Sequence, residues 1–159
     1  MQNLIKHIHK ALIKRGKTIS TAESCTGGRL SSILTQFSGS SNYFILGVIT
    51  YSDQSKNKIL KIPSSIIAQN GAVSKEVASL MAKNVRRIAK TDFGIGITGI
   101  AGPTGGTPNK PIGTVFIAVA NKNKLICKKF IFRGNRASIR KQSALESLRL
   151  LNQKCFTRL

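Results

Sequence analysis

The feature that most constrains the fold is a regular alternation of two apolar patterns along the chain. Apolar residues that recur every three or four positions predict helices, and short runs rich in β-branched and aromatic residues predict strands. The expected strands cover residues 17–22, 43–51, 92–98, 115–120 and 125–132. This order predicts a single α/β/α layered domain over residues 1–159, with a mixed sheet of about five strands flanked by helices.

Capping and turn residues set the expected helix boundaries. Gly16 ends a first helix, and a second, which contains Leu30, Ile33, Leu34 and Phe37, is expected to end at Gly39. Short helices are predicted at 55–60 and after Pro63. Ser74 and Asn135 are typical N-caps of two longer helices. Residues 121–123 are expected to form the turn of a hairpin between the last two strands.

Composition excludes several classes of protein. With 41% apolar residues in 159, the chain has enough material for a core. Its apolar runs are too short to span a bilayer, and its first 17 residues lack the apolar stretch of a signal peptide. The three cysteines, Cys25, Cys127 and Cys155, form no CxxC pair. We therefore expect reduced thiols, a cytoplasmic location, no membrane partner, no metal site and no cofactor.

The net charge is +21, from 26 Lys and Arg against 5 Asp and Glu. A basic surface attracts polyanions, so one interpretation is nucleic-acid binding. The other is compositional drift, because the lysines are scattered and the chain lacks the interleaved aromatic residues of a stacking surface. We favour drift and do not expect nucleic acid as a partner.

The densest glycine region predicts a ligand site. Half of the 14 glycines lie between Gly94 and Gly113, and the segment from Thr98 to Pro111 follows a predicted strand. Ligands in open α/β sheets bind beyond the carboxyl ends of strands, where exposed N–H groups can hold a phosphate or an oxyanion. The alternative is a long turn that needs glycine for positive φ. We favour a site, although the segment is not a P-loop.

Residues 22–28 form a second strand-to-helix junction. A Ser24 hydroxyl there would face a helix N-terminus, whose dipole favours developing negative charge. An N-cap is an equally good interpretation of Ser24, and Cys25 is a rival nucleophile. The order of residues leaves these alternatives open.

Two further sets of cations are candidates for the same site. Lys56 follows the second strand, where partial burial would lower its pKa enough for it to act as a base toward a serine. Arg133, Arg136 and Arg140 lie at the start of the last helix, where the dipole disfavours cations. This placement favours an anionic partner, which the arginines would clamp.

Taken in order, these motifs resemble the CinA C-terminal family, which includes stand-alone nicotinamide-nucleotide amidases. The resemblance extends from about Lys17 to Leu151. The matching stretches are 21–28 (TAESCTGG), 39–41 (GSS), 48–52 (VITYS) with Lys56, 71–74 (GAVS), 98–103 (TGIAGP), 110–114 (KPIGT), and Arg136 with Arg140.

The resemblance implies metal-independent hydrolysis of nicotinamide mononucleotide (NMN) to nicotinate mononucleotide and ammonia, in pyridine nucleotide salvage. It implies that Ser24 is the nucleophile, Lys56 its base, Tyr51 a hydrogen-bonding assistant, and Arg136 a contact to substrate or transition state. The substrate-binding residues that it implies are Thr26, Gly27, Ser41, Thr98, Gly99, Ala101, Gly102, Gly105, Gly106 and Arg140. It is also compatible with a homo-oligomer.

One position departs from the family pattern. The family often has an acidic residue before the arginine of its G-D-R run, where this chain has Asn135. The departure affects the orientation expected for Arg136 but removes no catalytic group. Two alternatives to an NMN amidase remain: a catalytically degenerate member that binds anions or nucleic acid through its basic surface, and an amidase for another substrate.

Overall fold

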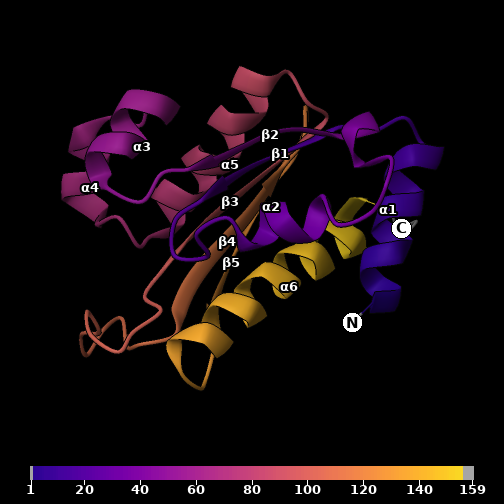
Figure 1. Cartoon of the computed structure of the whole chain (residues 1–159). Coiled ribbons are helices and arrows are strands. Elements are labelled where there is room, and N and C mark those ends of the chain that lie inside the picture. Colours follow the sequence, from indigo (N-terminus) through magenta and orange to yellow (C-terminus); the bar gives the residue numbers. More distant parts are fainter. Residues whose placement is uncertain (1, 156–159) are drawn as a thin grey trace.

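The computed structural model describes residues 2–155 of the chain. Five strands form one sheet in the order β2-β1-β3-β4-β5 (Figure 1). The strands are β1 (Ile19–Glu23), β2 (Phe44–Ile49), β3 (Phe93–Gly99), β4 (Thr114–Ala120) and β5 (Leu125–Ile131). Strand β1 is parallel to β2 and β3, whereas β4 is antiparallel to β3 and β5. The predicted mixed sheet and α/β class are confirmed.

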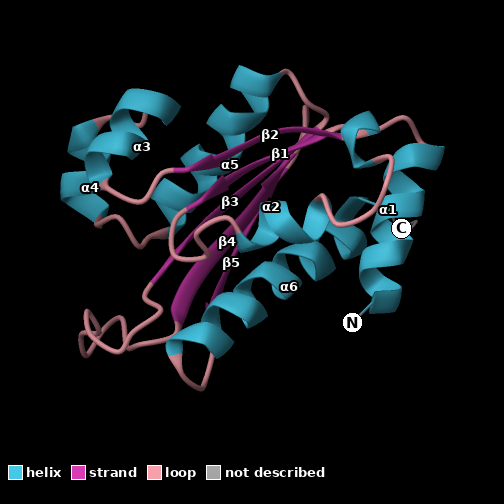
Figure 2. Cartoon of the chain, viewed as in Figure 1, coloured by secondary structure: helices cyan, strands magenta, loops and turns pink. Residues whose placement is uncertain are grey.

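Helices cover both faces of this sheet, which gives three layers (Figure 2). The helices are α1 (Gln2–Lys14), α2 (Arg29–Leu34), α3 (Asp53–Leu60), α4 (Ser64–Asn70), α5 (Lys75–Ala89) and α6 (Arg136–Cys155), with a short 3₁₀ helix η1 (Ser40–Asn42). Helix α5 lies on one face with α3 and α4 beside it, and α1, α2 and α6 cover the other. Each face therefore has its own apolar core.

Two glycines of β3 allow α5 to lie directly on the sheet. A Cβ at Gly94 would collide with the carbonyl oxygen of Ala82, and one at Gly96 with that of Ala78. The sequence pattern had grouped these glycines with the loop that follows. The structure separates them from it: Gly94 and Gly96 serve helix packing, and only the later glycines shape the loop.

Helix α2 is shorter than predicted. It ends at Leu34, with Thr35 as its C-cap, instead of continuing to Gly39. The Thr35 hydroxyl bonds to the carbonyl oxygens of Ser31 and Ser32, and the chain then turns through Gly39 at φ 85° into η1. Phe37 still packs on the core, but from a turn.

The predicted caps of the long helices are confirmed. The Ser74 hydroxyl accepts a hydrogen bond from the Val77 N–H, and Asn135 Oδ1 accepts one from the Ser138 N–H. Asn121 Oδ1 likewise closes the turn between β4 and β5. These side chains satisfy backbone donors that would otherwise lack partners.

Within residues 2–155, no helix is long and apolar enough to cross a membrane. Cys25 and Cys127 are free cysteines that form no disulfide bond. The predictions for the Cys155 thiol and for residues 156–159 fall outside what the structure describes.

Candidate active site

A pocket of about 280 Å³ lies at the carboxyl ends of the parallel strands. Ser24 directly follows β1, Tyr51 lies just beyond β2, and Thr98 and Gly99 end β3. The pocket is lined by Ser24, Cys25, Tyr51, Asp53, Lys56, Ala72, Val73, Thr98, Gly99, Ile100, Ala101, Gly102, Thr104, Gly105 and Arg136. Tertiary folding thus brings together all four residues that the sequence resemblance marks as catalytic.

Ser24 opens the turn that leads from β1 to α2. Its N–H donates to the Ile97 carbonyl oxygen at 3.0 Å, and its own carbonyl accepts from the Gly27 N–H at 3.0 Å. The residue is only 8% exposed but lines the pocket. The N-cap interpretation of Ser24 is wrong, because Gly28 is the N-cap of α2 and no side chain caps the helix from that position.

Glu23 holds this turn in place, a role that the sequence analysis missed. Its fully buried carboxylate accepts hydrogen bonds from the N–H groups of Gly28, Leu30 and Ser31, at 3.1, 3.1 and 2.8 Å, and from the Ser31 hydroxyl at 2.6 Å. A negative charge at the start of a helix is favoured by the dipole and by the unpaired N–H groups there. The signal in the sequence was an acidic residue at the end of a strand, directly before the turn into a helix.

Lys56 reaches the pocket from α3 and is 1% exposed. Its Nζ donates to the Tyr51 carbonyl oxygen at 3.2 Å and lies 3.7 Å from Asp53 Oδ1. Burial lowers the pKa of Lys56, and the Asp53 carboxylate, on an exposed side chain, opposes this only in part. A lowered pKa makes the neutral amine, the form that a general base requires, more accessible to a buried lysine.

Ser24 and Lys56 line the same pocket but are not hydrogen-bonded to each other. Among the hydrogen bonds of the described residues, none joins the Ser24 hydroxyl to Lys56 Nζ, which is directed to Tyr51 and Asp53. Catalytic hydrogen bonds often tighten only when substrate is bound. The Ser–Lys pair therefore stays a prediction.

Cys25 is a poor rival for the nucleophile. The thiolate is the reactive form of cysteine, and burial raises the pKa of the Cys25 thiol to about 12. At neutral pH the group is therefore a protonated thiol that packs in the core.

Arg136 ties the last helix to the pocket. Its Nη1 donates to the Gly102 carbonyl oxygen and its Nη2 to the Tyr51 hydroxyl, both at 2.8 Å. These bonds connect three segments that are distant in the sequence. Arg136 keeps this geometry without the acidic neighbour of the family pattern, because Gly102 and Tyr51 hold its guanidinium. Asn135, at the acidic position, caps α6 instead.

The glycine loop forms one wall of the pocket. Thr98, Gly99, Ala101, Gly102 and Gly105 line it, as the resemblance implies, and Gly102 adopts φ 74°, a conformation that favours glycine. The loop is anchored beside α4: the Thr98 hydroxyl donates to Ala72 O at 2.8 Å and Lys110 Nζ to Asn70 O at 3.0 Å.

Five of the expected substrate-binding residues lie outside this pocket. Arg140 Nη2 donates to the carbonyl oxygen of Thr26, itself buried, and Arg140 and Gly27 line a separate hollow. Gly106 packs against Ile112. Ser41 lies in η1, at the amino end of β2, so it is at the opposite end of the parallel strands from the pocket. The expected clamp is not assembled, because Arg136 and Arg140 are directed to different carbonyl groups.

Residues 1–155 match the CinA C-terminal domain. The chain belongs to this family. It is 47% identical over 144 residues to a putative competence-damage inducible protein of Caldanaerobacter subterraneus, which covers 91% of this chain and 35% of that protein. It is 46% identical over 143 residues to a CinA-like protein of Syntrophus aciditrophicus, which covers 89% of this chain and 34% of that protein. The chain thus spans about a third of the length of the curated relatives that it matches.

Solved structures agree with this membership. A competence damage-inducible protein A from Klebsiella pneumoniae superposes with a TM-score of 0.92 at 32% identity, over 96% of this chain and 94% of that one. A CinA superfamily protein from Escherichia coli gives 0.91 at 34% identity, over 95% and 88%. The layered fold is therefore that of the CinA superfamily.

Proposed function

We propose that this CinA domain is a hydrolase that converts NMN and water to nicotinate mononucleotide and ammonia, with Ser24 as nucleophile. The observation that carries the proposal is Lys56, a fully buried lysine with a lowered pKa in the same pocket as a serine. Burying an ammonium ion without a buried carboxylate partner is costly, so such lysines are usually functional.

The chemistry follows from these groups. The neutral amine of Lys56 takes the Ser24 hydroxyl proton while Oγ attacks the carboxamide carbon, forming a tetrahedral intermediate. The intermediate collapses to an acyl-serine ester, and the departing nitrogen takes the proton from Lys56 and leaves as ammonia. Water, deprotonated by the same amine, then cleaves the ester and restores the Ser24 hydroxyl as the carboxylate product leaves.

The remaining lining residues suit an anionic nucleotide. The Arg136 guanidinium is the fixed cation of the pocket wall, held by Gly102 and Tyr51. The glycine loop places backbone close to any bound ligand, and its N–H groups are the donors available to a developing oxyanion. A phosphate and a carboxamide on one substrate would thus meet different parts of the same pocket.

Ammonia release from NMN by the purified chain tests the proposal. We expect measurable turnover for the wild type and a loss of at least about 10³-fold for Ser24→Ala, because removal of the nucleophile abolishes the acyl-enzyme route. Cys25→Ala is the matched control, one residue away in the same pocket, and should retain most of the activity. No turnover by the folded wild type would reject the proposal, and a fully active Ser24→Ala would reject the nucleophile.

A further inference from the structure

The five acidic side chains of this basic protein occupy very different positions. Glu23 binds the N–H groups at the start of α2, and Glu146 accepts a hydrogen bond from Arg149 at 2.9 Å. Glu76 is exposed in the first turn of α5. None of these three carboxylates lines the candidate active site.

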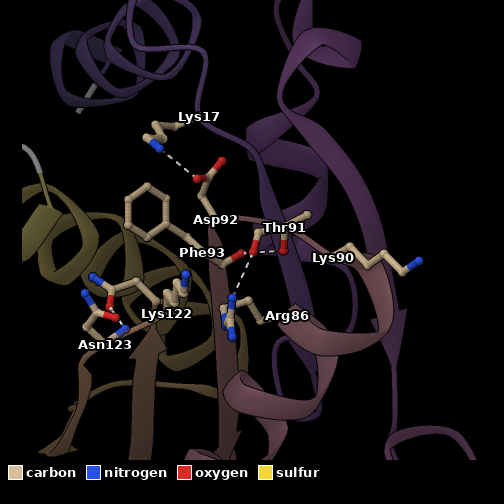
Figure 3. Close-up of a pocket in the computed structure, with 9 residues that line it drawn as sticks. Lys17, Arg86, Lys90, Thr91, Asp92, Phe93, Lys122 and Asn123 are labelled. Carbon is tan, nitrogen blue, oxygen red and sulfur yellow. Dashed lines mark hydrogen bonds and ion pairs between the residues drawn. The ribbon is translucent and has the colours of Figure 1, made fainter.

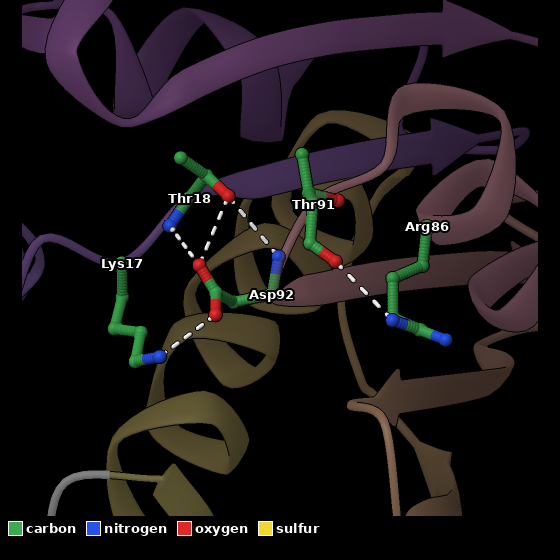
Figure 4. Close-up of polar contacts among 5 residues, drawn as sticks. All are labelled: Lys17, Thr18, Arg86, Thr91 and Asp92. Atoms are coloured by element: carbon green, nitrogen blue, oxygen red, sulfur yellow. Dashed lines mark hydrogen bonds and ion pairs between the residues drawn. The ribbon is translucent and has the colours of Figure 1, made fainter.

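Asp92 borders a surface hollow of about 380 Å³ at the opposite end of the parallel strands, where β1 and β3 begin (Figure 3). It accepts hydrogen bonds from Lys17 Nζ at 2.8 Å, from the Thr18 N–H at 2.9 Å and from the Thr18 hydroxyl at 3.1 Å (Figure 4). Partial burial works to raise the pKa of Asp92, but these hydrogen bonds outweigh it and hold the pKa below its usual value. The other charged side chains that border the hollow are basic: Arg86, Lys90 and Lys122. The charge of Asp92 is thus already balanced within the protein.

Asp53 differs from these four, because it is the one acidic residue among those that line the candidate active site. It lies in the first turn of α3, where the helix dipole favours a carboxylate. Its side chain is 62% exposed, and its Oδ1 lies 3.7 Å from Lys56 Nζ, compared with 2.8 Å in the ion pair of Lys17 and Asp92. The place in the helix accounts for an acidic residue, but it leaves the carboxylate open to the pocket.

The charge of Asp53 becomes unbalanced when Lys56 is in its base form. Burial lowers the pKa of Lys56, and the neutral amine is the form that would take the proton from Ser24. In the part of the chain that the structure describes, no other basic group lies within ion-pair distance of Asp53. The pocket wall then carries one negative charge, at Asp53, and one positive charge, at Arg136. A ligand with one charge of each sign matches this wall.

We propose that Asp53 is a specificity-determining residue that favours substrates whose carboxamide is attached to a cationic ring. The inference rests on the proposed function, because NMN has a positively charged pyridinium ring and a negatively charged phosphate. A substrate of the same shape with a neutral ring would lose the attraction to Asp53 and keep the contacts of its phosphate.

The distances allow this attraction. Proton transfer requires Lys56 Nζ about 3 Å from Ser24 Oγ, and attack requires Oγ about 3–3.5 Å from the carboxamide carbon. Since Asp53 Oδ1 lies 3.7 Å from Nζ, the carboxylate is at most about 10 Å from that carbon in the reacting complex. This limit is comparable to the screening length of about 8 Å in physiological salt, so the charge of the attached ring is within reach of Asp53.

Isothermal titration of Ser24→Ala with NMN and with its reduced form, NMNH, tests this role. The two ligands share the ribose, the phosphate and the carboxamide, but the ring of NMNH is neutral, and without the nucleophile neither ligand is consumed. We expect NMN to bind more tightly than NMNH. Adding Asp53→Asn should weaken NMN binding about three- to tenfold, as expected for a partly solvated charge pair, and change NMNH binding less than about twofold.

The matched control is Glu76→Gln in the same Ser24→Ala protein. It also removes one negative charge from the exposed first turn of a helix, but outside the pocket, so it should leave the preference for NMN over NMNH unchanged. Higher salt should reduce this preference when Asp53 is present and should have little effect on it in Asp53→Asn. A purely structural role of Asp53 would not produce this dependence on salt.

A second parent protein separates Asp53 from its effect on Lys56. Because Asp53 also raises the pKa of Lys56, its removal changes the charge of the amine as well. Lys56→Met has no amine to titrate, so Asp53→Asn in this parent removes only the carboxylate. The selective loss of NMN binding should appear there too.

Four results would overturn the proposal: equal weakening of both ligands by Asp53→Asn, unchanged NMN binding in that variant, equal affinity of Ser24→Ala for NMN and NMNH, or no binding of either ligand. Hydrolysis of NMN by the wild type is measured separately. Turnover together with any of these four results would reject the role of Asp53 alone. The expected binding pattern without turnover would reject the hydrolase and retain the recognition of a cationic ring.

Discussion

The two ends of the parallel strands use positive charge in different ways. At the carboxyl end, Lys56 is buried, its pKa is lowered, and the nearest carboxylate is on an exposed side chain. At the amino end, the cations are exposed or half-buried, and the one carboxylate, Asp92, has a lowered pKa. Burial of a lysine favours its neutral amine, which can accept a proton. A solvated lysine or arginine stays charged and can attract an anion. The same basic composition thus gives a buried amine with a lowered pKa at one end of the strands and solvated cations at the other.

The largest effect that separates the two ends is expected at Lys56. Lys56→Met keeps an apolar stem in the buried space but removes the amine, so kcat for NMN hydrolysis should fall about 10²–10⁴-fold, the usual contribution of a general base. Wild-type activity should rise with pH until the lowered pKa of Lys56 is passed. Asp53→Asn removes the carboxylate that raises this pKa, so the rise should move to lower pH. Rates that are independent of pH, or unchanged in Lys56→Met, would contradict a base at this position.

A smaller effect is expected at Glu23, which shapes the carboxyl end without lining the pocket. In Glu23→Gln, an amide group replaces one carboxylate oxygen, and backbone N–H groups of α2 then face a donor instead of an acceptor. Leaving such buried donors unpaired should lower the free energy of unfolding by about 3 kcal/mol. Urea denaturation measures this loss. Glu76→Gln, an exposed substitution in the first turn of α5, is the control and should cost less than about 0.5 kcal/mol; equal losses at both positions would show that Glu23 has no special structural role.

The smallest effect is expected at Asp92, at the amino end. The unfolded chain binds a proton at Asp92 more readily than the folded chain does, because the folded pKa is lowered. The contribution of Asp92 to stability is therefore fully present above about pH 4 and is lost as the pH falls through the folded pKa. Asp92→Asn should lower the free energy of unfolding at pH 7 by about 1 kcal/mol or less, because solvent screens the ion pair with Lys17. The difference from wild type should shrink as the pH falls through the folded pKa of Asp92; a difference that does not change with pH would show that packing, and not charge, is responsible.

Much of the fold was predictable from local patterns. The five strands and the caps at Ser74 and Asn135 follow from side-chain periodicity and from residues that satisfy backbone donors nearby. Errors arose where the cause was distant in sequence: Gly94 and Gly96 are glycines because α5 lies on β3, not because a loop follows. Helix α2 ends early because the Thr35 hydroxyl donates to the carbonyl oxygens of the last turn. Thr35 was a local signal for this end, but the prediction followed the apolar spacing, which continues to Phe37.

The candidate site divides in the same way. The resemblance to the CinA C-terminal family indicated Ser24, Tyr51, Lys56 and Arg136 as one group, and the pocket contains all four. The separate position of Arg140 and the contacts of the buried Glu23 carboxylate depend on the direction in which a side chain leaves its element. The location of Ser41 was implicit in the sequence, because Ser41 precedes the predicted strand 43–51 and therefore lies at its amino end.

The sequence by itself determined the family and the layered class, since these are carried by residue types in a fixed order, and through the family resemblance it predicted the serine and the lysine of the site. Only the tertiary structure decided that Lys56 is buried, that Cys25 is a protonated thiol, and that the amino-end cations border a hollow. The physical reason is that pKa and charge balance depend on solvent access and on neighbours from other elements, and both exist only after the chain has folded.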